Sequence, residues 1–212
     1  MRERPILFNG EMVRAVLDGR KTQTRRVIKP QPTFTDGPYL QESGLAEFAW
    51  CSGEDDRFEL RRCPYGQPGD RLWVRETWAA EEDYDSFAPS AFGPGGHKIW
   101  FKAGGDEPEN GAIGKTRPSI FMPRWASRIL LEVTDVRVER VQDISEEEAR
   151  AEGIIDGGCL MCGEPEPCGC DDPRPDARDA FVWLWNSINA KRGYGWDVNP
   201  WVWVVEFKVI SS

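Results

Sequence analysis

The chain has 212 residues, 40% of them hydrophobic, and its 27 basic and 36 acidic side chains give a net charge of −9. This length allows one domain with large insertions, and we expect a single domain over residues 1–212. No signal peptide is evident and no segment approaches the roughly 18 apolar residues of a membrane span, so a cytoplasmic protein without membrane contact is expected. The acidic balance disfavours sequence-independent binding to long nucleic acids, which depends on neutralising phosphates.

The first predicted element is a helix over residues 9–18, with Gly19 in the position of a left-handed cap. A cluster of basic and hydroxyl side chains follows it over residues 19–26. Cations at a helix C-terminus complement the helix dipole, so a structural role is one interpretation. The other is a site that binds an anion or activates a nucleophile. That site requires a turn or bulge after Gly19 to bring Lys21 and Thr24 together.

The middle of the chain is predicted to hold strands separated by insertions. A short strand over 27–29 ends at the prolines that follow it, and residues 33–66 read as an irregular insertion. A central strand is expected over 71–77. Glu76 follows two apolar residues on its face of this strand, which favours an ion pair with an arginine over a place in a polar cavity.

Residues 79–97 are acidic and then rich in glycine and proline, which predicts a surface loop. A short strand is expected over 98–102. A long strand is expected over 128–141, with a bend near Thr134 and Asp135.

A short helix is predicted next, because Ser145 and Glu148 have the spacing of a capping box. Glu148 therefore has a structural role, and Glu146 and Glu147 are expected to be solvated. Glu152 differs from these acidic residues because it ends the helix, directly before a glycine.

Four of the six cysteines form two close pairs next to glycines, which suits tetrahedral zinc. The predicted ligands are Cys159, Cys162, Cys168 and Cys170. Four sulfur ligands leave no open position, so the zinc would be structural. Unliganded thiols are the alternative, and disulfides are disfavoured in a cytoplasmic chain.

The C-terminal part is predicted to contain a helix over 176–190 and a strand over 201–210. The helix should bury one stripe of side chains, formed by Phe181, Leu184, Trp185 and Ile188. Most of the ten tryptophans should lie in the core, while Trp78 adjoins a polar loop where it could stack on a base.

Part of the basic cluster resembles the signature of the ASCH family, small PUA-like β-barrel proteins linked to RNA and modified nucleosides. The residues that carry this resemblance are Gly19, Lys21, Thr24 and Arg26. The helix at 144–152 and the terminal strand at 203–208 match the family in the same order. In its long N-terminal segment, the chain is similar to ASCH proteins of bacteriophages and prophages.

This resemblance implies an α+β fold, a small mixed PUA-like/ASCH β-barrel with flanking helices. The chain exceeds the compact family pattern by large loop insertions at 30–66, 79–120 and 156–176.

Some ASCH proteins are amidohydrolases that remove the acyl group of N4-acetylcytidine with a lysine, a threonine and a glutamate. The resemblance places these roles on Lys21, Thr24 and Glu152. Thr24 would attack the amide carbonyl and Lys21 would accept its proton, after burial has lowered the lysine pKa. Glu152 would orient the lysine or pass protons to the leaving amine. A carboxylate nearby opposes the lowered pKa, so the alternative is a cationic Lys21 that stabilises an oxyanion. This chemistry needs no cofactor.

Five further residues are candidates for substrate binding, namely Arg25, Arg26, Arg75, Glu76 and Trp78. The alternative function is a module that binds RNA or a modified base without turnover, with Lys21 and an arginine on phosphate. A third possibility, an ASCH-type ribonuclease, combines RNA binding with catalysis. The expected partner is accordingly a modified nucleoside or a short single-stranded RNA.

Overall fold

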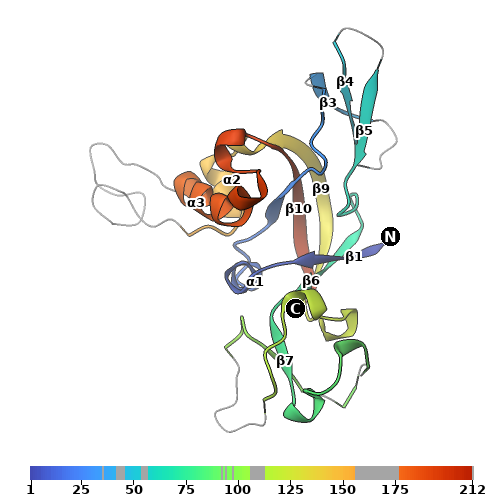
Figure 1. Cartoon of the computed structure of the whole chain (residues 1–212), viewed down its shortest axis with the longest axis vertical. Helices are drawn as coiled ribbons and strands as arrows, with labels where there is room; N and C mark the ends of the chain where they lie inside the picture. The colour runs from blue at the N-terminus through green and yellow to red at the C-terminus, as the bar shows by residue number, and fades with distance from the viewer. Residues whose placement is uncertain are drawn as a thin grey trace, which may run out of the picture.

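The structure is a computed structural model that describes residues 1–34, 36–41, 46–53, 57–91, 93, 95–96, 98–105, 113–155 and 177–211. Five strands form the central sheet, in the order β1 (Glu3–Leu7), β6 (Arg71–Arg75), β9 (Leu130–Arg140), β10 (Trp201–Ser211) and β2 (Gln23–Val27). β1 pairs with β6 in parallel, and the other neighbours are antiparallel. Three helices accompany the sheet, α1 (Gly10–Leu17), α2 (Glu146–Ala151) and α3 (Ala177–Asn189). Figure 1 shows α2 and α3 together beside β10, and α1 near β1.

The α+β class is as expected, but the expected closed barrel is not formed within the described residues. β1 and β2 are the two edges of the sheet, and the chain passes from one to the other through α1. Where a closed barrel would have a backbone ladder, the Arg26 guanidinium donates a hydrogen bond to the Leu7 carbonyl at 2.7 Å. The sheet is therefore open between these strands, and a side chain spans the opening.

Several local predictions are confirmed. Ser145 and Glu148 form the capping box of α2, with both reciprocal hydrogen bonds present. The long strand β9 bends where expected, because the register with β10 shifts at Thr134. Gly19 has a left-handed φ of 74° after α1.

Residues 33–66, predicted to be irregular, instead contain an antiparallel sheet of β3 (Asp36–Leu40), β4 (Glu47–Cys51) and β5 (Phe58–Arg62). This sheet extends away from the central one in Figure 1. Its middle strand is anchored by aromatic contacts, with Phe48 against Trp203 and Trp50 against Trp201, at ring distances of 5.6 and 6.0 Å. Distant partners therefore stabilise strands that the local pattern did not indicate.

The predicted loop after residue 78 also contains a strand, since β7 (Trp78–Ala80) pairs with β8 (Ile99–Phe101). Short 3₁₀ turns span Glu82–Tyr84, Pro89–Ala91, Ser119–Phe121, Arg124–Ala126, Val141–Asp143, Ala190–Arg192 and Trp196–Val198.

The hydrophobic core lies on both faces of the central sheet. Val205 and Phe207 of β10 face the larger cluster, while Val202 and Val204 face the cluster with α3. None of the helices in the described ranges is long and apolar enough to cross a membrane.

Candidate functional site

A cavity of about 620 Å³ has residues of both edge strands, β1 and β2, in its walls. The other walls come from α1, the end of β5, the residue after α2, and α3. Of the stripe predicted to be buried on α3, Phe181 and Trp185 are buried, whereas Leu184 and Ile188 are half-buried and line this cavity. The cavity thus coincides with the open side of the sheet.

Lys21 and Glu152 meet beside this cavity. They form an isolated antiparallel backbone bridge, and the Thr22 amide donates a hydrogen bond to the Ala151 carbonyl at 2.9 Å. The Lys21 ammonium donates three hydrogen bonds of 2.8 Å, to the Glu152 carboxylate, the Glu152 carbonyl and the Gln23 carbonyl. Only 1% of Lys21 and 5% of Glu152 is exposed. The two residues are therefore a buried ion pair.

The protonation of Lys21 is set by two opposing influences. Burial lowers the pKa of Lys21 below the ordinary lysine value, and the Glu152 carboxylate opposes this shift. An ammonium has three N–H donors, and all three have acceptors here. A neutral amine would leave one of these acceptors facing a lone pair. The hydrogen-bond geometry therefore matches a cationic lysine.

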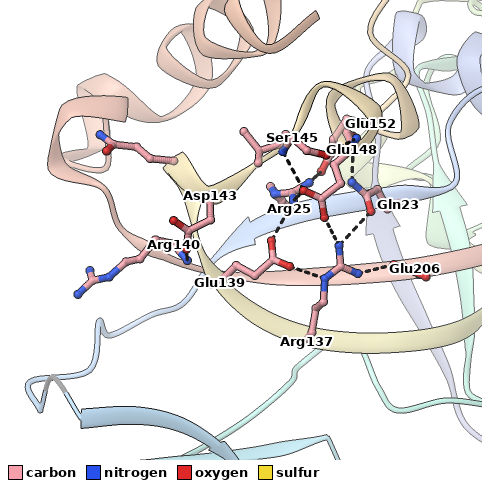
Figure 2. A network of polar contacts seen from close by, with 12 residues as sticks. Gln23, Arg25, Arg137, Glu139, Arg140, Asp143, Ser145, Glu148, Glu152 and Glu206 are labelled. Carbon is pink, nitrogen blue, oxygen red and sulfur yellow. Dashed lines mark hydrogen bonds and ion pairs between the residues drawn. The ribbon is translucent and has the colours of Figure 1, made fainter.

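Arg25 holds the other side of Glu152. Its side chain is fully buried and lies 3.5 Å from Glu152 Oε1, 3.0 Å from Glu139 and 3.1 Å from Glu148. Arg137 extends the network, because it binds both Glu139 and Glu148, as Figure 2 shows. Burial acts to raise the pKa of Glu148, but the Ser145 amide and the two arginines lower it overall. Arg25 is thus a structural part of the network that fixes the Glu152 carboxylate.

Thr24 lies on the opposite face of β2 from this network. Strand alternation places Gln23 and Arg25 on the face of β2 toward α2 and Thr24 and Arg26 on the other face, while Thr24, Arg25 and Arg26 all line the cavity. Thr24 is 2% exposed, and within the described part of the chain its hydroxyl makes no hydrogen bond. Both Thr24 and Glu152 line the cavity, and Lys21 is buried behind Glu152. β2 begins only at Gln23 and Lys21 forms an isolated bridge, so the segment after Gly19 departs from a regular strand.

The remaining candidates for substrate binding divide into two groups. Arg26 lines the cavity, with its guanidinium 5.5 Å from the Phe8 ring. Arg75, Glu76 and Trp78 do not line it, because they lie at or just beyond the end of β6 and face other elements.

Each of these three residues has another environment. Arg75 lies over the Trp73 ring, and Trp78 is fully buried in the cluster beside β8. Glu76 pairs with Arg128 through two contacts of 2.9 and 3.0 Å, which confirms the ion pair predicted from the sequence.

Other cavity residues were not singled out from the sequence, notably Lys29, Arg62, Tyr65 and Arg192. Arg62 and Tyr65 fall in or next to the segment predicted to be irregular, and no local pattern marks them as part of a site. The cysteines predicted to bind zinc lie outside the described residues. Among the residues that are described, no cluster of histidine, cysteine or acidic side chains is placed to hold a metal ion.

Comparison with known proteins adds little to this description. No family model matches the chain, and no curated protein matches it. Among solved structures, the chain is similar to protein EF3133 from Enterococcus faecalis V583, whose crystal structure is described under the family model DUF984. The TM-score is 0.42 at 10% identity, over 100% of this chain and 82% of that one. A similarity this weak says nothing about activity.

Proposed function

We propose that the protein is a hydrolase of the ASCH type that cleaves the acyl amide of a modified nucleoside such as N4-acetylcytidine. The observation that carries this proposal is the arrangement of Thr24 and Glu152 in the wall of one cavity, with Lys21 bound to Glu152 from behind. Nucleophilic amide cleavage needs an alcohol and a base that can take its proton, and Thr24 and Glu152 supply an alcohol and a carboxylate in the wall of one cavity.

In the proposed reaction, Thr24 Oγ1 forms a bond to the acyl carbon and the C–N bond of the amide breaks. No hydrogen bond joins Thr24 to Glu152 among the described residues, so in this proposal the threonine proton passes through one water molecule to the Glu152 carboxylate and then to the leaving nitrogen. Water cleaves the acyl ester in a second step and restores Thr24.

The roles of Lys21 and Glu152 in this proposal differ from those first expected. All three N–H groups of Lys21 are already used, and Glu152 rather than Lys21 lines the cavity. We therefore assign proton transfer to Glu152, and assign to Lys21 the positive charge and the hydrogen bond that orient this carboxylate. Lys21 is thus cationic, as in the second role considered from the sequence, but in this proposal its charge acts on Glu152 and not on an oxyanion.

The test is replacement of the nucleophile at constant side-chain volume. Thr24→Val is expected to reduce hydrolysis of N4-acetylcytidine at least about 100-fold, because it removes only the hydroxyl. Thr24→Ser keeps the hydroxyl and is expected to retain measurable turnover. Release of cytidine is followed by chromatography, and thermal melting checks that each variant folds.

Turnover by Thr24→Val at the parent rate would exclude Thr24 as the nucleophile. The alternative function, binding of RNA or a modified base without turnover, predicts no hydrolysis by the parent protein and unchanged binding by Thr24→Val.

A further inference from the structure

The charge of the cavity wall is opposite to that of the whole protein. Six basic side chains line the cavity, namely Arg25, Arg26, Lys29, Arg61, Arg62 and Arg192. Glu152 is the one acidic residue among the described lining residues. The chain as a whole has a net charge of −9, so this concentration of cations does not follow from composition. A concave surface lined by charges of one sign attracts ligands that carry the opposite charge.

Two of the six cations are neutralised by the protein itself. Arg25 is bound to three carboxylates, and Arg61 is paired with Glu59. These two arginines have structural partners and need no ligand.

The other four cations have no carboxylate partner among the described residues. Arg26 donates to the Leu7 carbonyl, and Lys29 Nζ lies 5.0 Å from the centre of the Tyr194 ring. Arg62 and Arg192 are exposed. The four come from different parts of the fold, since Arg26 and Lys29 belong to β2 and the residues after it, Arg62 ends β5, and Arg192 follows α3. Their shared position around one cavity is thus a result of the tertiary fold.

The cavity dimensions indicate which anion fits. A volume of about 620 Å³ is typical of a site for one small molecule. Arginine binds phosphate through paired charge-assisted hydrogen bonds, which makes a phosphate group a fitting partner for this wall. Arg26 is two residues from Thr24 on the same face of β2, about 6.6 Å along a strand. A phosphate near Arg26 and an acyl group at Thr24 can therefore belong to one ligand.

We propose that the cavity binds a nucleoside monophosphate, with the phosphate against Arg26, Lys29, Arg62 and Arg192 and the base toward Thr24 and Glu152. The position of the base rests on the proposed function, whereas the phosphate site rests on the four cations that have no carboxylate partner among the described residues. A free nucleoside would leave these cations without an anionic partner. A long RNA is disfavoured by the overall negative charge of the protein.

Calorimetric binding to the full chain tests this inference without any turnover. Cytidine 5′-monophosphate is expected to bind at least about tenfold more tightly than cytidine, and the difference should shrink as salt is raised. The double variant Arg62→Gln/Arg192→Gln should lose most of this preference while its affinity for cytidine stays the same. Lys191→Gln is the matched control, because Lys191 is exposed beside Arg192 but does not line the cavity.

Four results would overturn the inference. These are equal affinity for cytidine and its monophosphate, a preference that survives the double variant, inorganic phosphate binding as tightly as the nucleotide, and a short single-stranded RNA binding more tightly than the nucleotide. A different set of results would show that the proposed hydrolase function is wrong while this inference holds. In that case acylated cytidine is not hydrolysed, but the preference for the monophosphate and its dependence on Arg62 and Arg192 remain.

Discussion

Lys21 shows how a charged side chain is accommodated in the interior of this protein. Transfer of an ammonium from water costs several kcal/mol, and the attraction to a partner offsets this only when the remaining donors are also satisfied. Here one carboxylate and two carbonyl oxygens satisfy all three donors. The stability of the site therefore depends on the pair as a unit more than on either charge alone.

Lys21→Met is expected to lower the free energy of unfolding by about 3–5 kcal/mol, because it leaves Glu152 buried with Arg25 as a more distant cation. The double variant Lys21→Met/Glu152→Leu removes both charges and is expected to recover a large part of this loss. Urea unfolding of the parent, both single variants and the double variant measures the coupling. A double variant whose loss equals the sum of the two single losses would show that the two charges are not coupled.

The lowered pKa of Lys21 predicts opposite effects of alkaline pH on activity and stability. Lys21 should lose its proton below pH 10.5, the ordinary pKa of lysine. Glu152 then loses the nearer of its two cationic partners, so hydrolysis should fall. Between the lowered pKa of Lys21 and pH 10.5, the unfolded chain binds more protons than the folded one. The contribution of Lys21 to the unfolding free energy therefore rises with pH in this range.

The difference in unfolding free energy between the parent and Lys21→Met isolates this contribution. NMR titration of the Lys21 side chain gives its pKa directly. Glu152→Gln should lower that pKa further, because the carboxylate acts to raise it. A higher pKa in this variant would contradict the prediction.

At the scale of elements, the position of Glu152 at the end of α2 depends on Gly153, the next residue. Gly153 has a left-handed φ of 88°, and a Cβ atom there would lie 2.7 Å from the Cβ of Ala15 and 3.0 Å from that of Lys21. The end of α2 therefore packs directly on α1 and on the segment that carries Lys21. This close approach is possible only without a side chain at residue 153.

Gly153→Ala is accordingly expected to destabilise the protein by more than the roughly 1–2 kcal/mol of a left-handed backbone alone, and to reduce hydrolysis by displacing Glu152. Gly69→Ala is the matched control, since Gly69 has a φ of 86° and open space around its Cβ position. Thermal or urea unfolding compares the two. Equal losses of stability in the two variants would mean that the packing of α2 against Lys21 does not contribute to the stability of the fold.

Elements whose determinants are local could be predicted from the sequence. The capping box of α2 and the bend of β9 each depend on a few neighbouring residues. The sheet of β3, β4 and β5 could not be predicted in this way. Its buried side chains Phe48 and Trp50 pack on aromatic residues of β10, far along the chain.

At the scale of the whole molecule, the candidate site joins segments that are distant in sequence. Lys21 and Glu152 are 131 residues apart, and only the family resemblance, not spacing or periodicity, connected them. The basic residues of the cavity were even more difficult to predict, because no local sequence feature distinguishes Arg62 and Arg192 from other surface arginines. Glu76 was more accessible to prediction, since a carboxylate on an apolar strand face requires a cation nearby.

The open side of the central sheet has a mechanical consequence. β1 and β2 are held to their inner neighbours by backbone hydrogen bonds, whereas across the opening the described residues provide side-chain contacts of Arg26 with Leu7 and Phe8. A molecule lodged in the cavity touches both strands at once. Such a ligand would therefore add contacts between the two edge strands to the side-chain hydrogen bond that already joins them.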